Sequence, residues 1–190
     1  MASDKSTINV VVTGSGIRDE LLSVISRPKK PDIIIHHFPI NSSCSYEFHI
    51  KTKDEIWSGE FIPGRIDLVL HMGMRSSYPG YCLETRARKS GYKRNGKDGT
   101  PYPVAMIEPE RKELISFYLK DANIKVSQNA GEYFCEFEFW SCLASAYLKR
   151  QCRDVIFLHV PNDRSAEAIQ KGAMVAQGVI QAAVEEIERR

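Results

Sequence analysis

The sequence lacks any long hydrophobic segment. No apolar run approaches the roughly 20 residues that a membrane-spanning helix needs. The first residues, M-A-S-D-K-S-T-I-N, contain no hydrophobic core of the kind found in a secretory signal. The formal net charge of +2 is too small to favour nucleic acid as a partner. We therefore expect a cytoplasmic protein with neither a membrane nor a nucleic-acid partner.

Cysteine pairs at metal-binding spacing are also missing. The sequence contains five cysteines with irregular spacing and no C-x-x-C motif: Cys44, Cys82, Cys135, Cys142 and Cys152. A zinc site or a disulfide framework would need a more regular and paired arrangement. We expect reduced thiols, no metal and no cofactor.

Short continuous runs rich in valine and isoleucine are present, and helical patterns separate them. Such runs are typical of a parallel sheet covered on both faces. The alternation predicts a three-layer α/β/α fold with a twisted, mostly parallel sheet, and 190 residues fit one domain over 1–190. A long polar loop is expected over 74–104. The predicted strands are 8–14, 32–38, 67–73, 122–127 and 154–161, and the predicted helices include 109–121 and 165–188.

One cysteine, Cys135, has surroundings that suit a nucleophile. We expect a helix to begin after 122–127 with Asn129 as its N-cap and Glu132 three residues on, as in a capping box. Cys135 would then lie near the helix end at which negative charge is favoured. The alternative is that Cys135 is a small buried hydrophobe, which is the commoner role of an isolated cysteine.

A nucleophilic cysteine needs a base, and His159 is the best candidate. In a parallel sheet the ends of neighbouring strands and the starts of the helices that follow them gather at one edge. His159 ends the last predicted strand, so we expect it to lie beside Cys135. Glu84 is the candidate for orienting the imidazole, although from spacing alone a surface carboxylate is its commoner role.

The other histidines fit a catalytic or metal-binding role less well. His71 lies within an apolar strand and is expected to be a core residue with a satisfied hydrogen bond. His36 and His37 alternate between faces and have no metal-binding partners at a suitable spacing. His49 is expected on the surface of a strand.

Three segments carry a resemblance to a known family. They read L-E-T-R-A-R-K-S-G-Y-K, S-Q-N-A-G-E-Y-F-C-E-F-E-F-W-S-C-L and V-I-F-L-H-V-P, and all lie within 66–190. Together they resemble the pyroglutamyl peptidase I family of cysteine peptidases, in a divergent form similar to its animal and fungal members. That family has a phosphorylase/hydrolase-like α/β fold and cleaves an N-terminal pyroglutamyl residue from a peptide. The resemblance implies Cys135 as nucleophile, His159 as general base and acid, and Glu84 as the orienting residue.

The first strand departs from the family pattern. In the family it runs into T-G-F-x-P-F-G, whose aromatic side chains line the pocket for the pyroglutamyl ring; here T-G is followed by S-G-I-R. Two lost aromatic contacts, each worth on the order of 1–3 kcal/mol, would weaken discrimination between substrates. We expect Ser15 and Gly16 to bind substrate in this turn, where Arg18 adds a cation. The family geometry places Met74 and Arg75 at the substrate and the oxyanion.

Three functional hypotheses follow. The first is an exopeptidase that releases pyroglutamate from a peptide or small amide. The second is a thiol hydrolase or cyclase of the same fold that acts on another amide, a lactam or an ester. The third is a non-catalytic binding protein. The G-S-G turn lacks a full phosphate-binding motif, and the basic loop over 75–100 is expected to be a solvated face. The sequence leaves the oligomeric state open, a homo-oligomer included.

Overall fold

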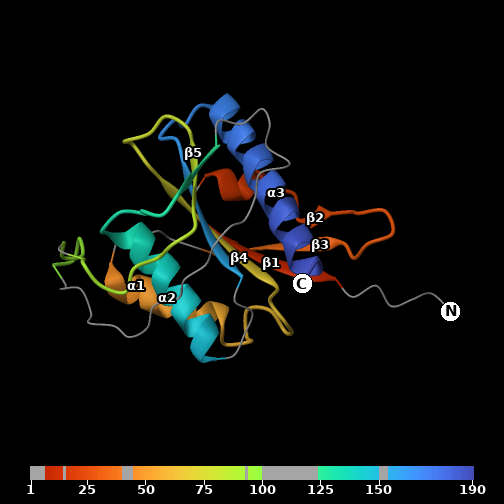
Figure 1. The fold of residues 1–190 in the computed structure, drawn as a ribbon, viewed down its shortest axis with the longest axis horizontal. Coiled ribbons are helices and arrows are strands. Elements are labelled where there is room, and N and C mark those ends of the chain that lie inside the picture. Colours follow the sequence, from red (N-terminus) through yellow and green to blue (C-terminus); the bar gives the residue numbers. More distant parts are fainter. Residues whose placement is uncertain (1–6, 15, 40–44, 93, 100–123, 150–153) are drawn as a thin grey trace.

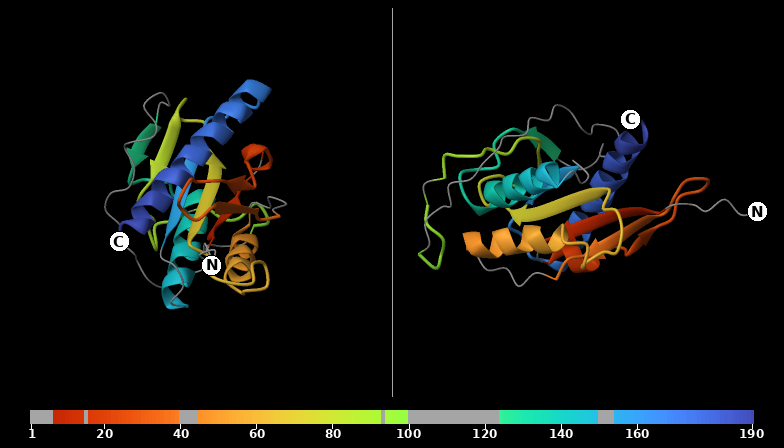
Figure 2. Two further views of the ribbon diagram at one scale, coloured as in Figure 1. Left: turned by 90° about the vertical axis from the view of Figure 1, so that its right-hand side faces the viewer. Right: turned by 90° about the horizontal axis from the view of Figure 1, so that it is seen from below.

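The computed structural model describes residues 7–14, 16–39, 45–92, 94–99, 124–149 and 154–190. These residues form a seven-stranded mixed sheet in the order β2-β3-β1-β4-β7-β5-β6. Figures 1 and 2 show α3 crossing one face of the sheet, while α1 and α2 lie side by side on the other. The strands are β1 (Ile8–Thr13), β2 (Val24–Ile25), β3 (Ile33–His37), β4 (Leu68–Met74), β5 (Tyr81–Glu84), β6 (Ile124–Ser127) and β7 (Val155–Val160). The helices are the 3-10 helix η1 (Ile17–Glu20), α1 (Tyr46–Ile56), α2 (Phe134–Leu148) and α3 (Ala166–Glu188).

The predicted three-layer α/β/α class is confirmed, and the central strands explain it. β3, β1, β4 and β7 pair in parallel, and each contains a run of aliphatic residues. Alternate side chains of these strands enter two separate cores. Val10, Leu70 and Leu158 pack beneath α3, whereas Val11 and Val69 pack beneath α1 and α2. Both faces are therefore apolar, which is why the strands read as continuous rather than alternating runs.

Several elements were missed by the sequence analysis. β5 lies inside the predicted loop 74–104; it has only four residues, all buried, so it shows no periodicity. β2 has only two residues, so it too shows no periodicity and was missed. His49 was expected on a strand but lies in α1, where it is buried. The predicted helix over 109–121 lies outside the described residues.

The predicted start of α2 was wrong. The helix begins at Phe134, with Tyr133 as its N-cap and no side-chain cap hydrogen bond. Asn129 instead accepts hydrogen bonds from the Gly131 N–H at 3.2 Å and from Arg88 Nη2 at 2.7 Å. Gly131 has a φ of 101°, a conformation that favours glycine, so this segment is a turn and not a first helical turn. Cys135 is consequently the second residue of α2.

The packing of α3 leads to a stability prediction. Ile180 is fully buried in the core between α3 and the sheet, whereas Met174 on the same helix is 73% exposed. We expect Ile180→Ala to lower the free energy of unfolding by about 2–5 kcal/mol because it leaves a cavity. Met174→Ala is the matched control and should change it by less than about 0.5 kcal/mol. Urea denaturation followed by circular dichroism measures both, and equal effects would contradict this description of the core.

Candidate active site

A buried carboxylate and an imidazole form the centre of the site. β5 runs antiparallel to β7, which puts Cys82 opposite His159 and Glu84 opposite Phe157. Glu84 is fully buried and His159 is 3% exposed. The Nδ1 atom of His159 lies 2.9 Å from Oε1 of Glu84. This bond orients the ring and leaves Nε2 as the nitrogen that can exchange a proton with a neighbouring group.

Cys135 lies beside this pair, above a glycine. Gly73 of β4 is the register partner of His159, and adjacent strands lie about 4.8 Å apart. A Cβ atom placed on Gly73 would lie 3.1 Å from the Cys135 sulfur and 2.8 Å from Cζ of Phe157. The Phe157 ring in turn packs against the His159 ring, with their centroids 4.8 Å apart. The missing side chain at Gly73 thus makes room for the thiol on the strand position paired with His159.

The sequence analysis placed Cys135 near His159 for a reason that proved incorrect. It assumed that the strand before α2 runs parallel to β7. β6 is parallel to β5, and β5 is antiparallel to β7, so β6 runs against β7. Glu84 is the register partner of both Ser127, at the end of β6, and Phe157 of β7, so Ser127 lies level with Phe157. The turn between β6 and α2, and not strand direction, brings Cys135 to the carboxyl end of β7.

Arg75 is a second partner of Glu84. Its Nη1 donates to Glu84 Oε1 at 3.0 Å and to the Asn129 carbonyl at 3.4 Å. Burial raises the pKa of Glu84, but hydrogen bonds from His159 and Ser127 and the positive charge of His159 outweigh it, and the pKa is lowered. The carboxylate therefore stays ionised, which suits a group that stabilises an imidazolium.

Arg88 holds the turn that precedes α2. Its Nε lies 2.9 Å from Oε1 of Glu136 and its Nη2 lies 2.8 Å from Oε2, and Nη2 also donates to the Gly131 carbonyl at 2.7 Å. Glu136 is 1% exposed, and burial raises its pKa in spite of the positive charge of Arg88. Because Glu136 follows Cys135 directly, the pair fixes the first turn of α2.

The four expected substrate-binding residues have different outcomes. Ser15 lies outside the described residues. Gly16 has a φ of 73° and open space around its Cα, and Met74 is 45% exposed at the end of β4. The backbone N–H of Arg75 donates to the Val160 carbonyl at 2.9 Å, so it is already used and does not suit an oxyanion.

In the turn after β1, Arg18 is not a free cation. Its Nη1 donates to the Phe38 carbonyl at 2.6 Å, and its Nη2 pairs with Asp19 at 2.8 Å. Neighbouring Ile17 is buried against α3. The turn therefore directs its apolar residue away from the face on which Cys135 lies.

A second polar cluster lies beneath α2. The prediction that His71 is a hydrogen-bonded core residue is confirmed, but the sequence analysis missed its partnership with Glu138. Nδ1 of His71 is 2.7 Å from the Thr13 hydroxyl and 3.1 Å from Oε1 of Glu138, while Nδ1 of His49 is 3.7 Å from Oε2 of Glu138. Burial lowers the pKa of His71, but electrostatic interactions and hydrogen bonds with Cys142 and Glu138 outweigh it and raise the pKa to about 10. The available signal was a glutamate, Glu138, inside the largely apolar run F-C-E-F-E-F-W, since such a carboxylate needs a partner.

Neither metal ligation nor membrane insertion is supported by the described part of the chain. It contains no group of three or more His, Cys, Asp or Glu side chains arranged to hold a metal ion. None of the helices found within it combines the length and apolar composition needed to cross a membrane.

Comparison with solved structures identifies the fold. A mutant pyrrolidone carboxyl peptidase from the hyperthermophile Pyrococcus furiosus has a TM-score of 0.63 and 15% identity, over 95% of this chain and 100% of that chain. The fold is that of the pyrrolidone carboxyl peptidases. The enzyme from Thermococcus litoralis has a TM-score of 0.65 and 13% identity over 96% of both chains. That from Fervidobacterium islandicum has a TM-score of 0.62 and 17% identity, over 92% of this chain and 99% of that one.

The similarity to pyrrolidone carboxyl peptidases is one of structure and not of overall sequence. No model of a protein family matches the chain, and no curated protein sequence does. The shared fold spans almost the full length of both chains.

The space above Gly73 can be tested by filling it. In Gly73→Ala the new methyl group would press on the Cys135 sulfur and on Phe157. We expect alkylation of Cys135 by iodoacetamide near neutral pH to slow at least several-fold, as followed by mass spectrometry of the folded protein. Gly172→Ala is the matched control, since it crowds Ile17 on the opposite face of the sheet. Equal alkylation rates in the wild type and Gly73→Ala would contradict the placement of the thiol.

The second cluster should give stability a specific dependence on pH. The folded-state pKa of His71 is raised from 6.5 to about 10, so its charged form stabilises the fold fully below about pH 6.5. This contribution should be lost as the pH rises toward 10. Urea denaturation of wild type and His71→Gln should therefore show a difference in unfolding free energy that shrinks at alkaline pH. His36→Gln, at a half-buried histidine whose pKa is lowered, is the control. A difference in unfolding free energy that does not vary with pH would contradict the presence of a charged His71 in this cluster.

Proposed function

We propose that this chain is a cysteine peptidase that hydrolyses the amide bond after an N-terminal pyroglutamyl residue. The observation that carries the proposal is the buried hydrogen bond between Glu84 and His159, with the Cys135 sulfur above the neighbouring Gly73. The fold shared with the pyrrolidone carboxyl peptidases supports it. A thiol, an imidazole and an orienting carboxylate are together the parts of a cysteine-based acyl transfer site.

The first half of the reaction forms an acyl-enzyme. His159 accepts the proton of the Cys135 thiol, and the thiolate attacks the carbonyl carbon that follows the pyroglutamyl ring. The carbonyl oxygen becomes an oxyanion in a tetrahedral intermediate. No side chain caps the first turn of α2, and its backbone N–H groups are the donors that we assign to this oxyanion. The C–N bond then breaks, and His159 gives its proton to the leaving amine.

The second half regenerates the enzyme. His159 accepts a proton from water as the water oxygen attacks the thioester carbon. The C–S bond breaks, pyroglutamate leaves, and the proton returns to the Cys135 sulfur. Glu84 holds the imidazole through Nδ1 and stabilises its cationic form during both halves, and Arg75 holds Glu84 in place through a hydrogen bond to the same oxygen.

A second candidate is a thiol hydrolase or cyclase that acts on a different amide, a lactam or an ester. The turn after β1 favours this candidate, because Ile17 is buried against α3 and Arg18 is paired with Asp19 and the Phe38 carbonyl. Neither residue replaces the aromatic walls expected for a pyroglutamyl ring. The two candidates share Cys135, His159 and Glu84 and differ only in the acyl group.

Turnover of a fluorogenic pyroglutamyl amide under reducing conditions tests the proposal. We expect the wild type to release the amine and Cys135→Ala to release none. Glu84→Gln should lower kcat/KM by roughly 10²–10⁴-fold, because the neutral side chain cannot stabilise the imidazolium. Cys142→Ala changes a buried cysteine further along α2 and should keep activity near that of the wild type.

The possible outcomes separate the hypotheses. A folded wild type without turnover, in which Cys135 nevertheless reacts with iodoacetamide much faster than the other cysteines, would favour the second candidate. Equal reaction rates for all the cysteines would favour a non-catalytic binding protein. Turnover retained in Cys135→Ala would overturn the assignment of the nucleophile.

A further inference from the structure

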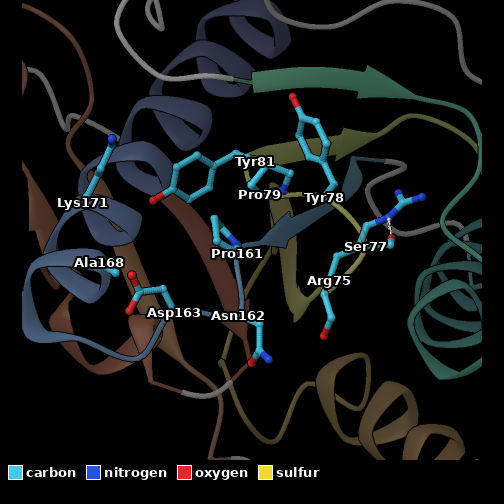
Figure 3. A pocket seen from close by; sticks show the side chains of 12 residues that line it. Arg75, Ser77, Tyr78, Pro79, Tyr81, Pro161, Asn162, Asp163, Ala168 and Lys171 are labelled. Carbon is cyan, nitrogen blue, oxygen red and sulfur yellow. Dashed lines mark hydrogen bonds between the residues drawn. The ribbon is translucent and has the colours of Figure 1, made fainter.

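A hollow adjoins the candidate active site at the carboxyl edge of the sheet. It has a volume of about 610 Å³, within the range of roughly 300–1,000 Å³ typical of small-ligand sites. Its walls come from the loop between β4 and β5, from residues 161–163 after β7, and from α3 at Ala168 and Lys171. Figure 3 shows Lys171 and Arg75 at opposite ends, with Tyr81, Pro79 and Tyr78 along one side.

The hollow begins next to the triad. Arg75 lines it and also donates to Glu84 Oε1 at 3.0 Å. Pro161, another lining residue, follows His159 by two positions, as Arg75 follows Gly73. Two residues of a strand span about 7 Å. Along the strand direction, about two residues of extended peptide therefore cover the separation between the level of Gly73 and His159 and the near wall of the hollow at Arg75 and Pro161, since an extended chain advances about 3.3–3.6 Å per residue.

The charges of the hollow favour an anion at its far end. Its ionised side chains are two cations, Arg75 and Lys171, and one carboxylate, Asp163. Arg75 is paired with Glu84, and Asp163 accepts the backbone N–H of Ser165 at 2.9 Å before α3 begins. Lys171 has no hydrogen-bond or ion-pair partner among the residues that the structure describes. It is therefore the cation available to a ligand.

The remaining walls are suited to apolar groups. Tyr78, Pro79 and Pro161 contribute ring surfaces between the two cations. Tyr81 is 5% exposed and its ring lies on the side nearest α3, where burial and the charge of Asp163 raise the pKa of its hydroxyl. A ligand with an aromatic or aliphatic side chain followed by a carboxylate matches this order of surfaces.

We propose that this hollow binds the leaving part of the substrate, a short peptide whose free C-terminal carboxylate pairs with Lys171. The inference rests on the proposed function and names its substrate class: pyroglutamyl tripeptides or similarly short peptides, with an apolar residue next to the scissile bond and an unblocked C-terminus. The amine product of the first half-reaction occupies the same hollow before it departs.

Matched substrates and variants test the role of Lys171. The substrates are pyroglutamyl-Phe-Ala with a free carboxylate, the same peptide with a C-terminal amide, and a fluorogenic pyroglutamyl amide that has no carboxylate. At low ionic strength the wild type should prefer the free acid over its amide by about two- to five-fold in kcat/KM, as expected for a single exposed ion pair. Lys171→Gln should abolish this preference and leave turnover of the fluorogenic amide unchanged. Lys51→Gln, at an exposed lysine of α1, should retain the preference.

The outcomes for the hollow are distinct from those for the proposed function. Equal kcat/KM for the acid and the amide in the wild type, or a preference that survives Lys171→Gln, would overturn the inference while the peptidase activity stands. If the wild type cleaves none of the three substrates, the proposed function fails and binding decides the question. The dipeptide Phe-Ala should then bind Cys135→Ala in a calorimetric titration and bind several-fold more weakly to Cys135→Ala/Lys171→Gln. Undetectable or equal binding would overturn the inference.

Discussion

The buried carboxylate of Glu84 is the constraint on which the rest of the site depends. A carboxylate with no solvent exposure is costly unless charged partners and hydrogen bonds replace water. Here His159 and Arg75 both reach the same oxygen, from the end of β7 and from the residue after β4. The ends of three strands are thereby tied to one atom. The short strand β5 carries this carboxylate as its last residue, although it lies within a polar stretch of sequence.

Two further carboxylates on the same side of the sheet extend the arrangement along α2. Glu136 is paired with Arg88, and Glu138 is paired with His71 beneath the helix. Each pair joins α2 to a different segment of the chain, and Cys135 comes directly before the first of them. Breaking one partner of such a pair leaves an uncompensated charge, so the pairs resist rotation of the helix. The position of the thiol is therefore set by ionic contacts as well as by apolar packing.

The sequence predicted those parts of the fold that long apolar patterns encode. β1, β3, β4 and β7 were found from continuous aliphatic runs, and α3 was found from the helical pattern over 165–188. β5 was missed because four buried residues show no period, and its antiparallel pairing with β7 joins segments that are far apart in the sequence. The start of α2 was misplaced because Asn129 has the side chain of a good N-cap but uses it within a turn that Arg88 holds. Cys135, His159 and Glu84 were selected by residue type and motif, and their proximity could not be derived from spacing.

The turn after β1 bears on which acyl groups the site accepts, whereas the groups that would attack the amide come from other segments. Gly14 has a φ of 119°, and a Cβ there would collide with the Met72 carbonyl, so the chain must turn sharply at the end of β1. The turn then buries Ile17 against α3, on the face opposite Cys135. Attack on an amide needs only the thiol, the imidazole and donors for the oxyanion, and none of these comes from the turn. Discrimination between acyl groups needs shaped walls, and the described residues of the turn lack the aromatic pattern of pyroglutamyl peptidases. The candidate catalytic residues can therefore be retained on this fold while the acyl group that the site accepts changes.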